Sequence, residues 1–287
     1  MQWRVRRSQF RAILSGNGCI HPASVFDPLS ARIAEHLGFE FAMFAGSTAS
    51  LTVLAAPDLI LLTATEFAQQ AQRICRAMSL PLLVDADHGY GNALNVGRTI
   101  EELVTAGVAA ATIEDTILPV PYGGNGKPGL ISREEGVGKM RAALAARPDQ
   151  SFAVIGRTSA PAISNIDDTV ARLRAYEQAG VDALFIVGLK SLADLAAVSA
   201  ATTLPLILGS TGGELAGADL SAHRVRISLQ GHLPIMAAVQ AIYDTMKALR
   251  EGTSPAQIKN VASPALMATL TRAAHYDEAT RDYLSAK

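Results

Sequence analysis

Charged residues, cysteines and long apolar runs are all scarce in this sequence, and each absence excludes a class of protein. Only 18% of the 287 residues are charged and the net charge is −1, so no overall field would attract nucleic acid or a membrane surface. No apolar run approaches the roughly 18 to 20 residues of a membrane-spanning helix. No apolar segment follows the N-terminal arginines, as a secretory signal would require. We therefore expect neither a nucleic-acid nor a membrane partner.

The cysteines and the basic residues point to no site of their own. Cys19 and Cys75 are too few for a disulfide framework and are not spaced as a metal motif, so free thiols in the reducing cytoplasm are expected. A solvated helix start or tail is favoured over a binding patch for the N-terminal basic cluster, which consists of Arg4, Arg6, Arg7 and Arg11.

Hydrophobic residues make up 49% of the sequence, enough for a substantial core, and short β-rich runs alternate with longer segments of helical spacing. The predicted strands are Cys19–Phe26, Glu40–Ala45, Pro81–Asp85, Ala109–Glu114, Phe152–Arg157, Ala183–Val187, Pro205–Leu208 and Val225–Leu229. The predicted helices are Pro28–Leu37, Thr65–Met78, Ala93–Ala106, Arg133–Ala146, Asp167–Ala179, Ser191–Ala200, Leu215–Ala222 and His232–Arg250. Several strands are apolar throughout, as in a parallel sheet that is buried on both faces.

About eight such βα units predict an α/β protein with a closed (β/α)8 TIM-type barrel. A doubly wound open sheet is the alternative, but the Gly-rich phosphate turn that it normally carries after its first strand is missing. We expect one barrel domain over residues 1–287, in which residues 251–287 form a C-terminal helical extension. Its short helices are predicted at Thr253–Asn260, Pro264–Ala274 and Asp277–Ala286.

Polar residues follow several of the predicted strands, where a (β/α)8 barrel places its chemistry. The second strand ends in A-G-S and the third in D-A-D-H-G-Y-G-N. The fourth ends in E-D and the fifth in R-T, and Q-G-H follows the eighth. These ends carry the candidate site residues Ser47, Asp85, Asp87, Glu114, Arg157 and His232.

The three acids of this set need a partner. Two carboxylates about 5 Å apart repel by about 3 kcal/mol at an effective dielectric near 20. Protonation, pairing with arginine or binding of a cation would each relieve this, and the hard oxygens of Asp85, Asp87 and Glu114 suit Mg²⁺, with Mn²⁺ as the alternative. The structural alternatives are that Asp85 caps its loop and that Glu114 pairs with a basic residue.

Arg157 and His232 have both a structural and a functional interpretation. Arg157 ends a buried strand, so it must be paired; it either binds a substrate carboxylate or forms a salt bridge with Glu114 or Asp115, and both can hold at once. His232 begins the last barrel helix over the mouth of the barrel, where a structural hydrogen bond and a role in catalysis are equally favoured.

Two glycine-rich segments are also expected at the barrel mouth. Tyr122–Gly129 suits a flap over the mouth, because no helix opens directly from it as a phosphate-binding loop would require. Gly209–Gly213 is equally compatible with an anion-binding nest and with a tight turn.

These motifs resemble the isocitrate lyase/phosphoenolpyruvate mutase superfamily over most of the chain. The most specific are D-A-D-H-G-Y-G-N, T-I-E-D and the R-T after the fifth strand. Within the superfamily the sequence looks most like the oxaloacetate decarboxylase branch, through S-V-F-D-P-L-S-A-R-I-A, A-G-S-T-A-S-L, V-L-A-A-P-D, E-E-G-V-G-K and Q-G-H.

The resemblance implies an α-keto dicarboxylate bound through Mg²⁺. Asp85 would be the direct ligand of the ion, and Asp87 and Glu114 would hold its waters. Ser47 and Arg157 would hold the substrate carboxylate, His232 would lie against the ligand, and Asp58 matches an acid that some members keep near the site. A homotetramer with exchanged C-terminal helices is also implied.

The sequence departs from its relatives in ways that bear on substrate choice. Isocitrate and methylisocitrate lyases carry a cysteine in a K-[KR]-C-G-H flap, whereas this flap has none, which argues against a lyase of that type. R-T-S-A replaces the R-T-N or R-T-D of many relatives, so that Ser159 follows Thr158. G-S-T-G-G stands where T-Y-G is expected of the decarboxylase branch.

The expected activity is decarboxylation of oxaloacetate to pyruvate and CO₂ through an enolate, with His232 or a bound water as the proton donor. A carbon–carbon or carbon–phosphorus lyase or mutase with a related substrate, phosphonopyruvate-like (an α-keto acid) or methylisocitrate-like, is the first alternative. The second is a barrel without catalysis that only binds a dicarboxylate.

Overall fold

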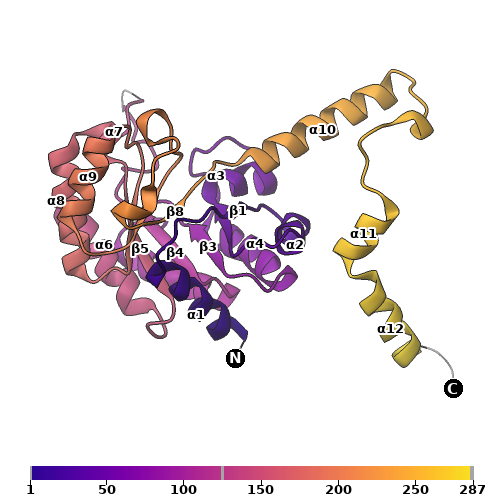
Figure 1. The fold of residues 1–287 in the computed structure, drawn as a ribbon, viewed down its shortest axis with the longest axis horizontal. Helices are drawn as coiled ribbons and strands as arrows, with labels where there is room; N and C mark the ends of the chain where they lie inside the picture. Colours follow the sequence, from indigo (N-terminus) through magenta and orange to yellow (C-terminus); the bar gives the residue numbers. More distant parts are fainter. Residues whose placement is uncertain (1, 124–125, 285–287) are drawn as a thin grey trace.

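The computed structural model describes residues 2–123 and 126–284 and contains one sheet of eight parallel strands, hydrogen-bonded in sequence order (Figure 1). Ile20, just before β1, pairs in parallel with Ile227 of β8 and so links the first strand region to the last. The predicted (β/α)8 barrel is therefore confirmed. The strands are β1 Ala23–Ser24, β2 Ala42–Ala45, β3 Leu82–Asp85, β4 Ala110–Glu114, β5 Ala153–Thr158, β6 Ala183–Ile186, β7 Leu206–Leu208 and β8 Val225–Ser228.

The helices between the strands begin and end close to the predicted positions, because capping residues that are recognisable in the sequence stand at their ends. Asp27 accepts a hydrogen bond from the backbone N–H of Ser30 at the start of α2, and Gly107 ends α5 in the left-handed conformation. The helices that follow β1 to β6 are α2 Pro28–His36, α4 Ala64–Ala77, α5 Ala93–Ala106, α6 Arg133–Ala146, α8 Ile166–Ala179 and α9 Leu192–Ala201.

The sequence analysis missed some short elements and merged others. The helical turns α3 Gly46–Ala49, η1 Ser50–Leu54 and α7 Ala160–Ile163 were not predicted. The single helix predicted at Leu215–Ala222 is wrong, because two 3₁₀ turns, η2 Gly213–Leu215 and η3 Leu220–His223, occupy that region. Each of these segments is shorter than the two turns or more over which a helical pattern is recognisable.

The N-terminal helix α1 (Gln2–Ser15) covers the end of the barrel at which the strands begin. Phe10 has no exposed surface and packs edge-to-face on Phe41, with ring centroids 5.6 Å apart. Arg6 donates to the carbonyl oxygen of Cys75 at 2.6 Å, and Arg7 donates to that of Val108 at 3.3 Å. These arginines are 4% and 6% exposed, so the prediction that the basic cluster is solvated is wrong for them.

The rest of this helix is held in the same way. Arg11 forms a salt bridge of 2.7 Å with Asp182, which immediately precedes β6. The guanidinium carbon of Arg6 lies over the ring of Trp3, 4.7 Å from the ring centroid. The Trp3 ring also lies close to Gly107, where an added Cβ would be 2.8 Å from the ring atoms. The arginines of the helix thus attach it to backbone carbonyls of the barrel.

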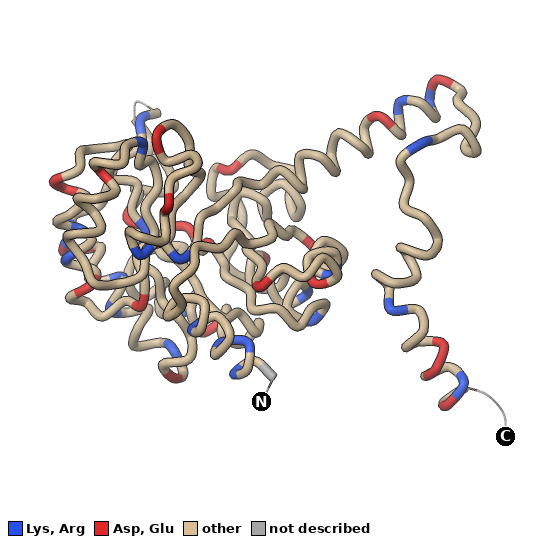
Figure 2. Tube along the Cα trace, viewed as in Figure 1, with Lys and Arg blue, Asp and Glu red and all other residues tan. Residues whose placement is uncertain are grey.

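The helix after β8, α10 (Leu233–Arg250), extends away from the barrel, and the chain then turns back towards it through α11 Pro264–Thr271 and α12 Ala273–Leu284 (Figure 1). α11 contacts α2, where Arg272 forms a salt bridge of 2.9 Å with Glu35 and Arg32 donates to the carbonyl oxygen of Leu270 at 2.9 Å. Two of the three predicted tail helices correspond to α11 and α12, the 3₁₀ turn η4 Pro255–Gln257 lies within the first, and residues 285–286 of the third lie outside the described residues. Figure 2 shows that charged residues occupy only the far end of α10. In the described part of the chain, no helix has the length and apolarity that crossing a membrane requires.

Candidate active site

A cavity of about 270 Å³ opens at the end of the barrel where the strands terminate. It contains all six candidate site residues predicted from the sequence, together with Asp58. Its other side chains are mainly apolar, so that charge is concentrated in one part of the wall. The lining includes Ser24, Met43, Ser47, Asp58, Asp85, Asp87, Glu114, Leu118, Arg157, Phe185, Val187, Ser210, Leu229 and His232.

Strand register brings the acids and the arginine together. Asp85 at the end of β3 is paired with Thr112 of β4, and Glu114 at the end of β4 is paired with Arg157 of β5. The Thr112 hydroxyl donates to Oδ1 of Asp85 at 2.7 Å, which leaves Oδ2 facing Arg157. In the same way the Thr116 hydroxyl donates to Oε2 of Glu114 at 2.7 Å.

Arg157 forms ion pairs with both neighbouring acids. Its Nη1 contacts Oδ2 of Asp85, and its Nη2 lies 3.4 Å from Oε2 of Glu114. The guanidinium also lies over the Phe185 ring, 5.3 Å from the centroid. Burial alone would lower the pKa of Arg157, but the charges of Asp85 and Glu114 outweigh it and raise that pKa. The predicted salt bridge to Glu114 is therefore present. The Nε of Arg157 is buried and has no hydrogen-bond partner among residues 2–123 and 126–284.

One arginine does not balance the acids around it. Asp87 is 8% exposed and itself has a positive φ of 49°, a conformation that aspartate tolerates better than most residues. Burial raises the pKa of Asp87 well above its usual range, and the charges of Asp85, Glu114 and Asp58 raise it further. Burial also raises the pKa of Glu114. This excess of buried carboxylate is an environment that a divalent cation would stabilise.

These acids suit a metal ion that keeps several water ligands. They are less suited to an ion whose ligands all come from the protein. Among residues 2–123 and 126–284, no group of three His, Cys, Asp or Glu side chains is close enough to hold a metal by itself. Mg²⁺ commonly binds one or two carboxylates and completes its octahedron with water and substrate oxygens. Asp85, with one oxygen fixed by Thr112, and the nearby Asp87 and Glu114 fit that requirement.

Gly46 explains how Asp87 reaches this position. The residue follows β2 at the start of α3, and a Cβ placed there would lie 2.7 Å from Cγ of Asp87. The carboxylate therefore occupies space that only glycine leaves open. The adjacent Ser47 lines the cavity from the same turn.

His232 enters the cavity from the other side of the barrel. It precedes α10, and its Nδ1 lies 2.8 Å from the hydroxyl of Ser24 on β1. Burial lowers the pKa of His232, although the negative charges of Asp85 and Asp58 act in the opposite direction. Burial and the charge of Asp85 likewise raise the pKa of Asp58.

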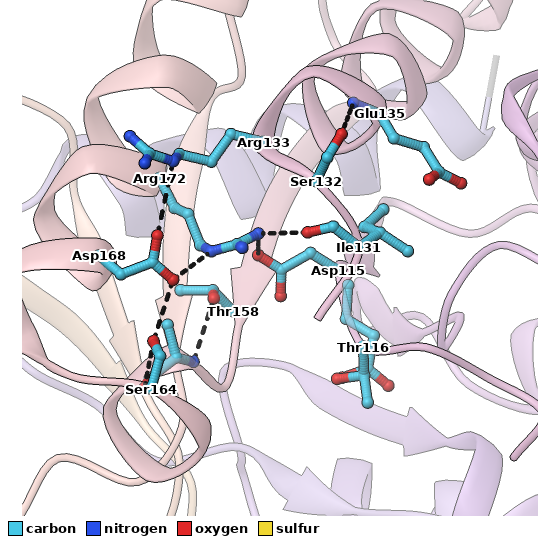
Figure 3. Close-up of polar contacts among 12 residues, drawn as sticks. Asp115, Thr116, Ile131, Ser132, Arg133, Glu135, Thr158, Ser164, Asp168 and Arg172 are labelled. Carbon is cyan, nitrogen blue, oxygen red and sulfur yellow. Dashed lines mark hydrogen bonds and ion pairs between the residues drawn. The ribbon is translucent and has the colours of Figure 1, made fainter. Parts of the chain in front are cut away.

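Asp115, the alternative partner considered for Arg157, lies outside the site. It has no exposed surface and pairs with Arg172 at 3.0 Å and with the hydroxyl of Tyr176 at 2.7 Å. Figure 3 shows Arg172 between Asp115 and Asp168, with a further hydrogen bond of 3.0 Å to the carbonyl oxygen of Ile131. Because side chains alternate along a strand, Glu114 faces the cavity and Asp115 faces the helices.

This network fixes the base of the predicted flap. The backbone N–H of Ile131 donates to the Asp115 carbonyl at 2.9 Å, and Thr116 pairs with Leu130 in an antiparallel bridge. Leu118 brings the first arm of the flap to the cavity wall. Residues 124–125 within the predicted flap Tyr122–Gly129 lie outside the described residues.

Sequence reasoning missed the residues that support the site. Thr112 and Ser24 are short polar residues within apolar strands, and Gly46 is one glycine among 23. Thr112 could have been found, because it lies two positions before Glu114 and therefore on the same face of the strand. Of the two departures from the relatives, Gly209 and Ser210 line the cavity. Ser159 is not among the described residues that line it and directly precedes α7, where its carbonyl oxygen accepts from the N–H of Ala162 at 3.0 Å.

The sequence pattern described as phosphoenolpyruvate phosphomutase matches residues 10–250 of the chain.

The chain belongs to the phosphoenolpyruvate phosphomutase family.

Within this family, the oxaloacetate decarboxylase of Bradyrhizobium diazoefficiens is 56% identical over 288 residues, which cover 100% of both chains. The structure of oxaloacetate acetylhydrolase with the inhibitor 3,3-difluorooxalacetate has a TM-score of 0.86 and 27% identity, covering 99% of each chain. Phosphonopyruvate hydrolase, solved with oxalate and Mg²⁺, has a TM-score of 0.84 and 28% identity, covering 98% of this chain and 99% of the other. The predicted membership of the phosphoenolpyruvate mutase group is thus confirmed.

Proposed function

We propose that this protein decarboxylates oxaloacetate to pyruvate and CO₂ in a reaction that depends on Mg²⁺. The observation that carries the proposal is the 56% identity, over the whole length of both chains, to a protein named oxaloacetate decarboxylase. The site supports it, because the cavity combines an excess of acids suited to a cation with Arg157, which suits a carboxylate.

The proposed roles follow from the positions of the side chains. Asp85 would be the direct ligand of Mg²⁺, and Asp87 and Glu114 would hold water ligands of the ion. Ser47 and Arg157 would bind the substrate carboxylate, and His232 would contact the ligand from the opposite wall. When bound, Mg²⁺ would supply a Lewis acid for the negative charge that develops in the reaction.

The reaction needs no nucleophile. The bond between C3 and the distal carboxylate breaks, CO₂ leaves, and the electron pair stays on the three-carbon fragment as an enolate. One proton added at C3 then gives pyruvate. The guanidinium of Arg157 would stabilise the enolate charge, which is larger in the transition state than in the bound substrate. Met43, Leu118, Phe185 and Leu229 would exclude bulk water from the leaving carboxylate.

A carbon–phosphorus bond hydrolase is the second candidate, favoured by the similarity to phosphonopyruvate hydrolase. The same acids and arginine would suit that substrate. The two candidates differ in the group that leaves from C3, so they are separable by direct assay.

A panel of α-keto acids tests the proposed function. Oxaloacetate is expected to give pyruvate with Mg²⁺, and chelation by EDTA should reduce turnover to the uncatalysed rate until Mg²⁺ or Mn²⁺ is restored. Pyruvate formation is coupled to NADH oxidation by lactate dehydrogenase, with phosphonopyruvate and methylisocitrate assayed in parallel. Full activity of the chelated protein, or a preference for phosphonopyruvate, would contradict the proposal.

We also propose that the protein is a homotetramer in which residues 251–287, an extension of the single barrel domain, pass with α10 to a neighbouring subunit. In that exchange the contacts that α11 makes with α2 of its own chain, through Arg272 and Glu35, would form between subunits instead. An apolar groove of about 450 Å³ lies beside α2 and the start of α10. No charged residue occurs in Leu233–Tyr243. Exposed apolar side chains continue along α10, namely Leu233, Met236, Val239, Ile242, Tyr243, Met246 and Leu249. A free chain would expose this surface to water, which favours association.

Light scattering coupled to size-exclusion chromatography tests the assembly. The wild-type protein is expected to elute as a tetramer, and the double variant Met236→Glu/Met246→Glu as a smaller species, because two charges would be buried in the subunit contact. Leu94→Glu is the matched control, since Leu94 is exposed and apolar but lies on the barrel helix α5. A monomeric wild type at micromolar concentration would contradict the proposal.

A further inference from the structure

The contact between Ser24 and His232 joins two parts of the chain that are 208 residues apart. Ser24 lies on β1, where it is paired with Met43 of β2, whereas His232 belongs to the short connection between β8 and α10. The two side chains line the same cavity. The serine hydroxyl and Nδ1 of the histidine are 2.8 Å apart.

This contact determines which ring nitrogen is left for a ligand. The His232 side chain does not cap α10, although its residue stands at the cap position. Its Nδ1 faces Ser24, so Nε2 on the opposite side of the ring is the nitrogen that remains for a ligand in the cavity. A serine on a paired strand is a firmer support for the ring than the glycine-containing connection that carries the histidine.

The surrounding charges favour one tautomer of the ring. Burial lowers the pKa of His232, so the ring is neutral at pH 7 and carries a single N–H. The negative charges of Asp85 and Asp58 raise the pKa of this ring, and the positive charge of Arg157 is a smaller influence in the opposite direction. An N–H at Nε2 is stabilised by the two negative charges, whereas a lone pair at Nε2 is repelled by them. Nδ1 then accepts a hydrogen bond from the Ser24 hydroxyl.

We propose that Ser24 is a positioning residue, which holds His232 in the tautomer that presents its Nε2–H to an oxygen of the bound keto acid. The inference rests on the proposed decarboxylation and specifies the part of His232 in it. The Nε2–H donates a hydrogen bond to the oxygen on which enolate charge develops, and the ring keeps its proton. The proton that C3 gains therefore comes from water, because a neutral imidazole is a poor proton donor.

Kinetics of single and double variants test the inference. Ser24→Ala is expected to lower kcat for oxaloacetate by about 5- to 10-fold, the usual effect of one hydrogen bond, with little change in KM or thermal stability. Ser24→Thr keeps the hydroxyl and should recover most of kcat. In a His232→Gln background, Ser24→Ala should cause no further loss, because the residue acts only through the histidine.

The control is Ser15→Ala, which removes an exposed hydroxyl that donates to the backbone carbonyl of Ala12. If the losses from Ser24→Ala and His232→Gln multiply in the double variant, or if Ser24→Thr is as impaired as Ser24→Ala, the positioning role is overturned.

Nitrogen-15 NMR of histidine-labelled protein tests the tautomer without any turnover. The His232 signals, identified by their loss in His232→Gln, should show a protonated Nε2 and an unprotonated Nδ1 near pH 7, and Ser24→Ala should give a mixture of tautomers. A wild-type ring with its proton on Nδ1 overturns the inference. If the wild type does not decarboxylate oxaloacetate, the proposed function fails, and the NMR result alone decides the role of Ser24.

Discussion

Replacement of Asp85 by asparagine is expected to lower kcat/KM for oxaloacetate by about 10³-fold, the largest effect of any single substitution in this protein. The change keeps the shape of the side chain and its contact with Thr112 but removes the negative charge between Arg157 and the proposed ion. Loss of one preorganised electrostatic contact costs about 10² to 10³ in rate, and loss of a direct metal ligand adds to this.

Two measurements separate this effect from unfolding. Binding of Mn²⁺, followed by electron paramagnetic resonance, should weaken in Asp85→Asn in parallel with activity, while the melting temperature stays near that of the wild type. Asp182→Asn is the control, because Asp182 likewise forms salt bridges with arginine, in its case with both Arg11 and Arg147, but at the opposite end of the barrel. Unchanged Mn²⁺ affinity in Asp85→Asn would rule out Asp85 as a ligand.

The second large effect is expected from Gly46→Ala, although Gly46 is not itself a proposed metal or substrate ligand. The new Cβ would meet the carboxylate of Asp87, whose Cγ is 2.7 Å from that position. The side chain of Asp87 would rotate away, and kcat/KM should fall by about 10²-fold, since misplacement by about 1 Å is enough for such a loss. The free energy of unfolding should change little, because the end of a short side chain moves and the backbone does not.

Gly138→Ala serves as the matched control for this prediction. Gly138 lies within α6, and a Cβ there would meet nothing within 4 Å, so alanine should stabilise the helix slightly and leave kcat/KM unchanged. An active Gly46→Ala enzyme with wild-type Mn²⁺ affinity would mean that the position of Asp87 is not critical.

The barrel and the main residues of the site were predictable because both depend on local patterns. Runs of apolar residues between glycine-capped helices indicate parallel strands, and the ends of such strands meet at one edge. Asp85, Glu114 and Arg157 therefore had to lie close together once eight strands were accepted. The alternation of side chains along β4 also separates Glu114 from Asp115.

The remaining features depend on contacts between distant parts of the chain. The pairing of Ser24 with His232 spans 208 residues, and that of Arg7 with Val108 spans 101. No periodicity within a window of sequence reports such contacts. The arginines of α1 illustrate this, because a run of basic residues near a terminus usually faces solvent, and only the carbonyls of α4, α5 and their loops give Arg6 and Arg7 a buried environment.

The seating of α1 has a practical consequence for spectroscopy of this protein. Trp3 is the sole tryptophan of the chain, and it lies against Gly107 and Arg6 at the end of the barrel remote from the acids. Intrinsic emission therefore follows the attachment of the N-terminal helix and is insensitive to events among Asp85, Arg157 and His232. Trp3 therefore reports on the end of the barrel that α1 covers. A change in its fluorescence during chemical denaturation would show when α1 detaches from that end.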